Sequence, residues 1–121
     1  MRRPEKLAET LREEITEIVG YELEDPRLLS VTVTDVRVAE NLREAKVFVV
    51  VEGSETEIKD ALKALQNAAS FVRQQVAQSM NLRHPPLLNF VRDTVEENAR
   101  RVNELLEEIN VDGETETESG K

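Results

Sequence analysis

The strongest indication of the fold lies in residues 25–51, which read DPRLLSVTVTDVRVAENLREAKVFVVV. β-branched residues dominate two runs in this stretch, as is typical of strands. The dipeptide Asp25-Pro26 ends any helix before the first run, because a residue that precedes proline is pushed out of the helical region. We therefore expect strands at residues 29–38 and 44–52, joined by a hairpin loop at residues 39–43.

Side-chain alternation within these two strands predicts which residues are buried. In the first strand, Val31 and Val33 share one face, whereas Val36 and Val38 fall out of phase with them. This change of phase predicts a bulge or a bend at Asp35. The second strand alternates without a break. Its inward-facing residues are expected to be Ala45, Val47, Val49 and Val51, with Lys46, Phe48, Val50 and Glu52 on the other side.

Helical periodicity flanks the strand region. Pro4 suits the first turn of a helix, and apolar residues recur at helical spacing up to Glu22. A second helical stretch, residues 56–80, is long for one straight helix in a small domain, so we expect a kink near Ala69-Ser70. A short third strand at residues 87–91 and a last helix at residues 94–109 complete the pattern.

The order α-β-β-α-α-β followed by a terminal helix predicts an α+β fold. We expect a single domain at residues 1–110, in which helices pack on one face of a mixed three-stranded sheet. Each of the two helices before the third strand is expected to reverse the direction of the chain. The third strand is therefore expected to run antiparallel to the second and parallel to the first. Residues 111–121 contain one apolar residue and are expected to form a disordered acidic tail.

Composition excludes several classes of function. The chain has 121 residues, 39% of them hydrophobic, and 16 Lys and Arg against 25 Asp and Glu give a net charge of −9. It has no Cys and one His, so thiol chemistry, disulfides and His-based metal or catalytic sites are not expected. Neither a signal sequence nor an apolar run long enough to cross a membrane is visible, which predicts a cytoplasmic address.

The most informative charge feature is an absence. Residues 61–92 contain no Asp and no Glu, and they carry Lys63, Arg73, Arg83 and Arg92. The segment therefore has a net charge of +4, and the remaining residues sum to −9 − 4 = −13. This asymmetry is typical of a phosphate-binding surface. The alternative is that a largely buried helix simply lacks room for carboxylates.

Uncharged polar side chains reinforce the first interpretation. The segment holds several Gln, Asn and Ser residues, which can serve phosphate, sugar and base edges of RNA. His84 beside Arg83 either contacts a phosphate or base or is an ordinary loop residue. Arg27 is expected to pair with an acid and fix the turn, and the three Phe residues are expected in the core.

Longer motifs in the same stretches resemble those of a known family. The run Asp25-Pro26-Arg27-Leu28, the strand block from Val31 to Val36 and the block from Leu42 to Val49 resemble ribosome-binding factor A, a bacterial cold-shock and small-subunit maturation factor. Further matches lie in the long helical stretch and around the third strand: Leu65, Asn67, Ala68, Phe71, Val72, Arg73, Leu82, Arg83, Pro85, Phe90 and Asp93. The resemblance extends over residues 3–109.

The resemblance implies a type II KH-like fold in which a helical kink with an Ala-x-Gly sequence replaces the usual GxxG loop. Here the kink motif falls on Ala68-Ala69-Ser70, with serine where glycine is usual. Serine lacks the backbone freedom of glycine, although its hydroxyl can bond a backbone carbonyl and bend a helix. The sequence also departs from the family at residues 97–101, where a glycine and one residue fewer are usual.

The function implied by the resemblance is non-enzymatic. It is binding of the immature 30S ribosomal subunit and its 16S rRNA, in late maturation and rRNA processing, by a protein without cofactor, metal or small-molecule substrate. Nothing in the sequence suggests an obligate dimer, so we expect a monomer. The RNA-binding residues are expected to be Ala68, Ala69, Ser70, Arg73, Arg83 and His84, with Arg2, Arg3 and Lys6 as a second contact.

Two other classes of function are weighed against this hypothesis. The chain could be a protein-interaction module that uses the acidic last helix and tail to engage basic ribosomal proteins. A carboxylate-based hydrolase would need paired carboxylates converging in a cleft. The segment expected to line the groove contains no carboxylate, and adjacent pairs such as Glu13-Glu14 point in different directions on a helix.

Overall fold

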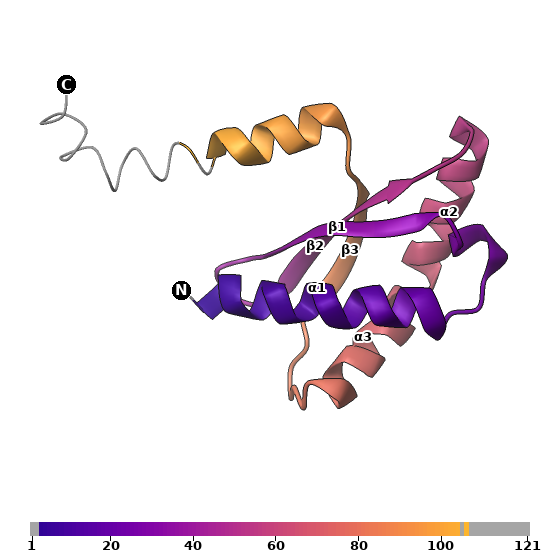
Figure 1. Cartoon of the computed structure of the whole chain (residues 1–121). Helices are drawn as coiled ribbons and strands as arrows, with labels where there is room; N and C mark the ends of the chain where they lie inside the picture. The colour runs from indigo at the N-terminus through magenta and orange to yellow at the C-terminus, as the bar shows by residue number, and fades with distance from the viewer. Residues whose placement is uncertain (1–2, 105, 107–121) are drawn as a thin grey trace, which may run out of the picture.

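The computed structural model describes residues 3–104 and 106, which form an α+β fold around a three-stranded sheet (Figure 1). The elements run in the order α1 (Arg3–Tyr21), the 3₁₀ helix η1 (Pro26–Leu28), β1 (Val31–Val38), β2 (Glu44–Val51), α2 (Glu55–Asn67), α3 (Ala69–Ser79) and β3 (Leu87–Arg92). Residues 95–104 form a further stretch of helix, which we call the C-terminal helical segment. The predicted element order is confirmed.

The core lies between the sheet and the helices α1, α2 and α3. Leu11, Ile15 and Ile18 of α1 are spaced at one helical turn and are fully or almost fully buried. They pack with the inward-facing residues of β2, which are the ones predicted: Ala45, Val47, Val49 and Val51. Removal of these aliphatic side chains from water is the main force that holds the layers together.

The turn between α1 and β1 is held by Asp25 and Arg27. The Asp25 carboxylate accepts a hydrogen bond from the backbone N–H of Arg27 at 2.9 Å and caps η1. The Arg27 guanidinium also donates from Nη2 to Asp25 at 2.8 Å. These hydrogen bonds lower the pKa of the Asp25 carboxyl. The expected pairing of Arg27 with an acid is confirmed.

β1 and β2 form an antiparallel pair with one irregularity. Val33 lies opposite Val49 and Asp35 lies opposite Phe48, so Thr34 is the extra residue of a β-bulge. Because of this extra residue, Val33 and Val36 are both buried on the core side. The bulge predicted at Asp35 is confirmed and centres one residue earlier.

The predicted direction of the third strand is wrong. β3 pairs with β2 in parallel and is therefore antiparallel to β1. The two helices before β3 do not reverse the chain twice, because α2 and α3 follow one another along the same side of the sheet (Figure 1). Together they act as the single helical crossover of a βαβ unit, which joins parallel strands.

The break between α2 and α3 lies at Ala68, where φ is −91° and ψ is 2°. α2 begins with a capping box in which the Ser54 hydroxyl accepts from the backbone N–H of Glu57, whose carboxylate accepts from the backbone N–H of Ser54. The break at Ala68 confirms the kink expected near Ala69-Ser70 and lies one residue earlier than predicted. α3 ends at Ser79, and Asn81 follows with a positive φ of 56°.

The opposite face of the sheet carries the C-terminal helical segment (Figure 1). Arg101 of this segment is buried, and its guanidinium lies 4.0 Å from the centroid of the Phe48 ring. Phe48 is therefore on the side of β2 predicted from the alternation. The remainder of the helix predicted at residues 94–109 and the tail predicted at residues 111–121 extend beyond the described residues.

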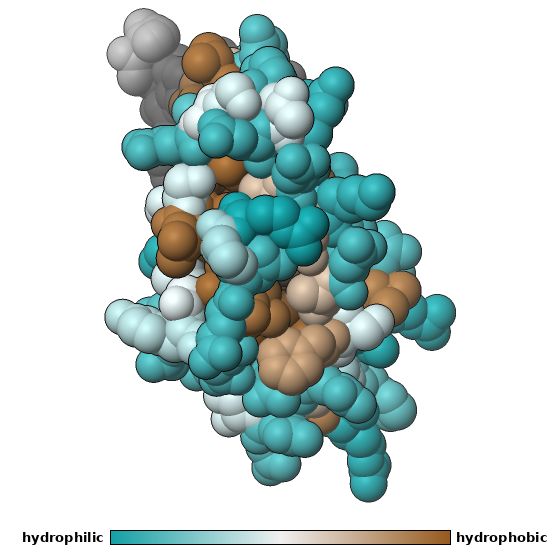
Figure 2. All heavy atoms as spheres, turned by 90° about the vertical axis from the view of Figure 1, so that its right-hand side faces the viewer, coloured by the Kyte–Doolittle hydropathy of each residue, from teal (hydrophilic) through white to brown (hydrophobic). Residues whose placement is uncertain are grey.

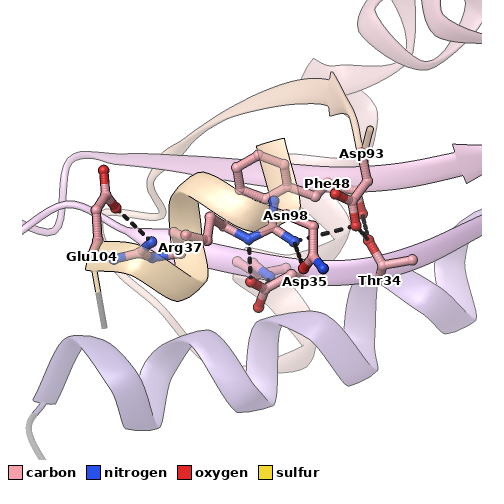
Figure 3. Close-up of polar contacts among 9 residues, drawn as sticks. Thr34, Asp35, Arg37, Phe48, Asp93, Asn98 and Glu104 are labelled. Atoms are coloured by element: carbon pink, nitrogen blue, oxygen red, sulfur yellow. Dashed lines mark hydrogen bonds and ion pairs between the residues drawn. The ribbon is translucent and has the colours of Figure 1, made fainter. Parts of the chain in front are cut away.

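Arg101 forms ion pairs with two carboxylates next to the bulge, Asp35 and Asp93, both of which are labelled in Figure 3. Its Nε lies 3.0 Å from Asp35 Oδ2, and its Nη2 lies 3.2 Å from Asp93 Oδ2. Thr34 donates from its hydroxyl to Asp93 at 2.6 Å. Burial alone would raise the pKa of Asp93, but the hydrogen bond from Thr34 and the hydrogen bond and charge of Arg101 hold it below its usual value. The residues of the bulge thus form the contacts that hold the C-terminal helical segment on the sheet.

The side of the molecule that carries η1 and α2 is mainly hydrophilic (Figure 2). Apolar side chains appear there as separate groups between polar ones. Leu29, at the end of η1, is 87% exposed. Scattered apolar residues of this kind are normal on a protein surface.

Candidate nucleic-acid interface

The kink places Ser70 at the surface. Ala68 and Ala69 are half-buried, whereas Ser70 is exposed in the first turn of α3. No side chain caps the N-terminus of α3. The backbone N–H groups of this first turn are the groups that an anion could accept from.

Arg73, one of the predicted RNA-binding residues, makes hydrogen bonds within the chain. Its Nη2 donates to the carbonyl oxygen of Pro85 at 2.8 Å, and its Nε donates to the carbonyl oxygens of Pro85 and Pro86 at 3.1 and 3.2 Å. The guanidinium therefore ties α3 to the segment that leads into β3. Arg73 is half-buried, so its charge is still close to the surface.

A large hollow lies between the first turns of α1, the β1–β2 loop and the segment before β3. We call it the main hollow, and its volume is about 1070 Å³. The described apolar residues that line it, which we call its floor, are Leu7, Leu42, Leu82, Pro85, Pro86 and Leu87. The described polar residues that line it, which we call its rim, are Lys6, Thr10, Asn41, Arg43, Arg73 and His84. The main hollow thus brings together Lys6, Arg73 and His84, which the sequence had placed in two separate contacts.

The charge of the main hollow is of one sign. Among the described residues that line it, three are cationic and one is histidine, and none is Asp or Glu. Within residues 3–104 and 106, Lys6, Arg43, Arg73 and Arg83 form no ion pair. On a chain with a net charge of −9, this is a local positive surface, and such a surface attracts anions.

A smaller hollow lies at the kink. We call it the kink hollow; its volume is about 370 Å³, and it is lined by Ser70, Phe71, Arg73, Gln74, Ala77 and Pro85. Phe71 is 41% exposed, so the expectation that all three phenylalanines belong to the core is wrong for this one. An exposed aromatic ring next to a polar helix start can stack on a base. Arg73 and Pro85 line both hollows, so the two hollows adjoin.

The other predicted cations differ in whether they form an ion pair with a carboxylate of the described residues. Arg83 is exposed next to His84. Arg92, in contrast, forms a two-pronged ion pair with Glu55 of α2, with both N–O distances at 3.2 Å. The acid-free segment is therefore partly neutralised by an acid from outside it. Arg2 lies outside the described residues, and Arg3 is the first residue of α1.

Sequence reasoning missed Leu42 and Arg43 because they lie outside the acid-free segment. They belong to the β1–β2 loop, and the sequence marked them only as the start of the block from Leu42 to Val49 that resembles a known family. The positive charge of Arg43 in a short loop is a second sequence signal that points to it.

Two other kinds of site find no support in the part of the chain that the structure describes. No cluster of three His, Cys, Asp or Glu side chains there could hold a metal ion. Its helices are also too short or too polar to span a bilayer. The buried carboxylate Asp93 serves Arg101 and Thr34, so this acid is a structural group.

Comparison with known proteins gives one consistent result. The family model described as "Ribosome-binding factor A" matches residues 3–106. Proteins of that name are 45% identical over 104 residues in Desulfitobacterium hafniense and 48% identical over 107 residues in Thermomicrobium roseum. The alignments cover 86% and 88% of this chain, and 83% of each relative.

Solved structures agree with the sequence matches. The crystal structure of ribosome-binding factor A from Thermus thermophilus superposes with a TM-score of 0.67 at 28% identity, over 75% of this chain and 97% of that one. A homology model of the Thermus thermophilus factor, fitted into a cryo-EM map of a 30S complex, gives a TM-score of 0.60 at 30% identity, over 69% and 88% of the two chains. These matches confirm the expected α+β, KH-like fold.

Proposed function

The chain belongs to the ribosome-binding factor A family, and on that premise we propose that it binds the immature 30S subunit through 16S rRNA and assists late maturation and rRNA processing. It does so as a non-enzymatic, monomeric factor in the cytoplasm, with a role in cold shock. The homology model of the Thermus thermophilus relative was fitted into a cryo-EM map of a complex of that factor with 30S, and this supports the choice of partner.

The observation that carries the proposal is the charge of the main hollow. Lys6, Arg43 and His84 converge there without a carboxylate among the described lining residues, although acids outnumber bases in the chain. Phosphate groups of rRNA are the anions that such a rim attracts. Exposed Ser70 lines the adjoining kink hollow, and exposed Arg83 directly precedes His84 in the chain.

The mechanism is differential binding. The factor stabilises a precursor conformation of the subunit to the extent that it binds that conformation more tightly than the mature one. It leaves when the mature conformation forms, and no covalent step is needed. In this mechanism Arg73 is a positioning residue, because it holds the segment that presents Arg83 and His84.

Charge reversal on the proposed surface tests this function. Lys6→Glu combined with Arg83→Glu should abolish co-sedimentation with 30S subunits, because both side chains are exposed and the fold does not depend on them. Arg12→Glu combined with Lys59→Glu makes the same change in net charge elsewhere on α1 and α2 and should leave binding intact. Equal loss of binding in the two variants would remove Lys6 and Arg83 from the site.

The protein-interaction alternative receives no support from the described part of the acidic helix. Glu97 pairs with Arg100, and Glu104 pairs with Arg37 of β1 at 3.1 Å. These acids are engaged within the chain. The alternative predicts that deletion of residues 111–121 weakens binding to the subunit and that RNase treatment of the subunit does not.

A further inference from the structure

We propose that the main hollow is a seat for an unstacked nucleotide of single-stranded RNA, with the base on the apolar floor and the flanking phosphates on the cationic rim. The inference rests on the proposed function and adds to it the form of RNA that is bound. The main hollow adjoins the kink hollow, with which it shares only Arg73 and Pro85 among the described lining residues.

The floor is what distinguishes this site from a simple phosphate contact. Leucine and proline side chains line it, and Leu87 remains 57% exposed. A phosphate group gains no binding free energy from contact with an apolar surface. The flat face of a base does, because its transfer from water to such a surface is favourable. In a duplex the bases are stacked and out of reach, so only an unstacked base can use this floor.

The backbone conformation of Leu42 is unusual for a leucine. Its φ is +64°, in the left-handed region that favours glycine or asparagine. The loop fixes this conformation through a 2.8 Å hydrogen bond from the N–H of Leu42 to the carbonyl oxygen of Ala39. A leucine in a strained conformation on the floor of a hollow indicates that its apolar side chain is needed there.

The walls of the main hollow are tied to one another. The N–H of Leu87 donates to the carbonyl oxygen of Arg43 at 2.8 Å, which joins the β1–β2 loop to the start of β3. The N–H of Arg43 donates to Asn41 Oδ1 at 2.9 Å, and Arg73 holds Pro85 from the α3 side. Binding therefore costs little ordering of the protein.

The rim favours RNA over a peptide. Lys6 and Arg43 are hydrogen-bond donors of positive charge, and no carboxylate among the described lining residues offers an acceptor to a peptide N–H. Arg43 and His84 also have planar groups that stack on bases. Charge and shape thus match a nucleotide with its phosphates.

The test uses the whole chain and two RNA probes. One is a fluorescently labelled single-stranded hexaribonucleotide of uridine, and the other is a labelled RNA hairpin that is paired throughout its stem. The variant Leu42→Glu puts a carboxylate on the floor without touching Arg73 or Arg83. Leu29→Glu makes the same change at a surface position directly after η1. Leu42→Asn removes the apolar side chain while suiting the left-handed backbone.

The wild type should bind the single strand more tightly than the hairpin. Leu42→Glu and Leu42→Asn should weaken single-strand binding about 10-fold, the loss that accompanies one seated base, while Leu29→Glu stays within about 2-fold of wild type. Circular dichroism should show all variants folded. Leu42→Asn keeps the net charge, so its loss of affinity would report the apolar contact itself.

Three results would overturn the inference. The first is single-strand binding that is the same in Leu42→Glu and Leu29→Glu. The second is equal weakening of single strand and hairpin, which would make the main hollow a reader of phosphates alone. The third is loss of 30S sedimentation in Leu42→Asn with unchanged RNA binding, which would indicate a protein contact. In each case, continued sedimentation of the wild type with 30S would show that the proposed function itself stands.

Discussion

Arg73 donates from Nη2 to the carbonyl oxygen of Pro85 at 2.8 Å and so ties α3 to the segment that carries His84. The arginine that the sequence marked as a phosphate contact thereby shapes the surface on which other cations act. Arg83, ten residues later, has no such bond within the described residues and is exposed. This difference separates the effects that the two arginines have on stability and on binding.

Arg73→Ala should lower the free energy of unfolding by about 2 kcal/mol, because hydrogen bonds from a charged donor contribute about 1.5–3 kcal/mol. Arg83→Ala should change it by less than about 0.5 kcal/mol, as expected for an exposed side chain. Urea unfolding followed by circular dichroism measures both. Equal destabilisation by the two substitutions would contradict the positioning role of Arg73.

Arg101→Met should destabilise the fold by about 3 kcal/mol, because it leaves Asp93 buried without its counter-charge. Amide hydrogen exchange should then become fast across residues 95–104. Arg100→Met is the matched control, since the Arg100–Glu97 pair is on the surface and should contribute less than about 0.5 kcal/mol. Unchanged exchange in Arg101→Met would mean that other contacts hold the segment.

Asp93 makes stability depend on pH in the acid range. Its pKa is lowered in the folded chain relative to that of an unfolded aspartate, which is about 3.9. The folded state therefore gains stability above that value and loses it as the pH falls through the folded pKa. Unfolding free energies measured from pH 7 to pH 2 should fall more steeply below pH 4 in the wild type than in Asp93→Asn. Parallel curves would show that Asp93 does not contribute.

Ser70→Gly should cost about 0.5 kcal/mol, because Ser70 lies within α3 and glycine is the poorer helix former. Ser70 is not among the described residues with positive φ, and the break itself lies at Ala68. The kink therefore does not need glycine at this position. Thermal unfolding compares the two proteins; a more stable Ser70→Gly would indicate strain at the kink.

Local features were predictable where one residue type dominates the local physics. The β-branched runs, the phase change near Asp35 and the long interrupted helix all appear within two residues of the predicted place. The direction of β3 was not predictable in the same way. It depends on whether α2 and α3 continue or reverse the path of the chain, and no residue type in the sequence marks that difference at the break at Ala68.

The positive charge of the candidate site could be predicted from the sequence, whereas the hollow that its residues line could not. The absence of acids over residues 61–92 pointed to Arg73, Arg83 and His84. The contribution of Lys6, Leu42 and Arg43 to one hollow arises from contacts between distant segments, which no local pattern records. Arg101 likewise gains its role only when the bulge at Thr34 brings Asp35 to the far side of the sheet.

The most direct test of the central claim is quantitative sedimentation of the chain with 30S, 50S and 70S particles across a salt series. We expect preferential binding to 30S, with the logarithm of the affinity falling linearly with the logarithm of the salt concentration. Removal of each contacting cation, Lys6 or Arg83, should reduce that slope by about one unit. Equal binding to 50S, or an affinity that does not respond to salt, would contradict the claim that a cationic surface docks this acidic chain on ribosomal RNA.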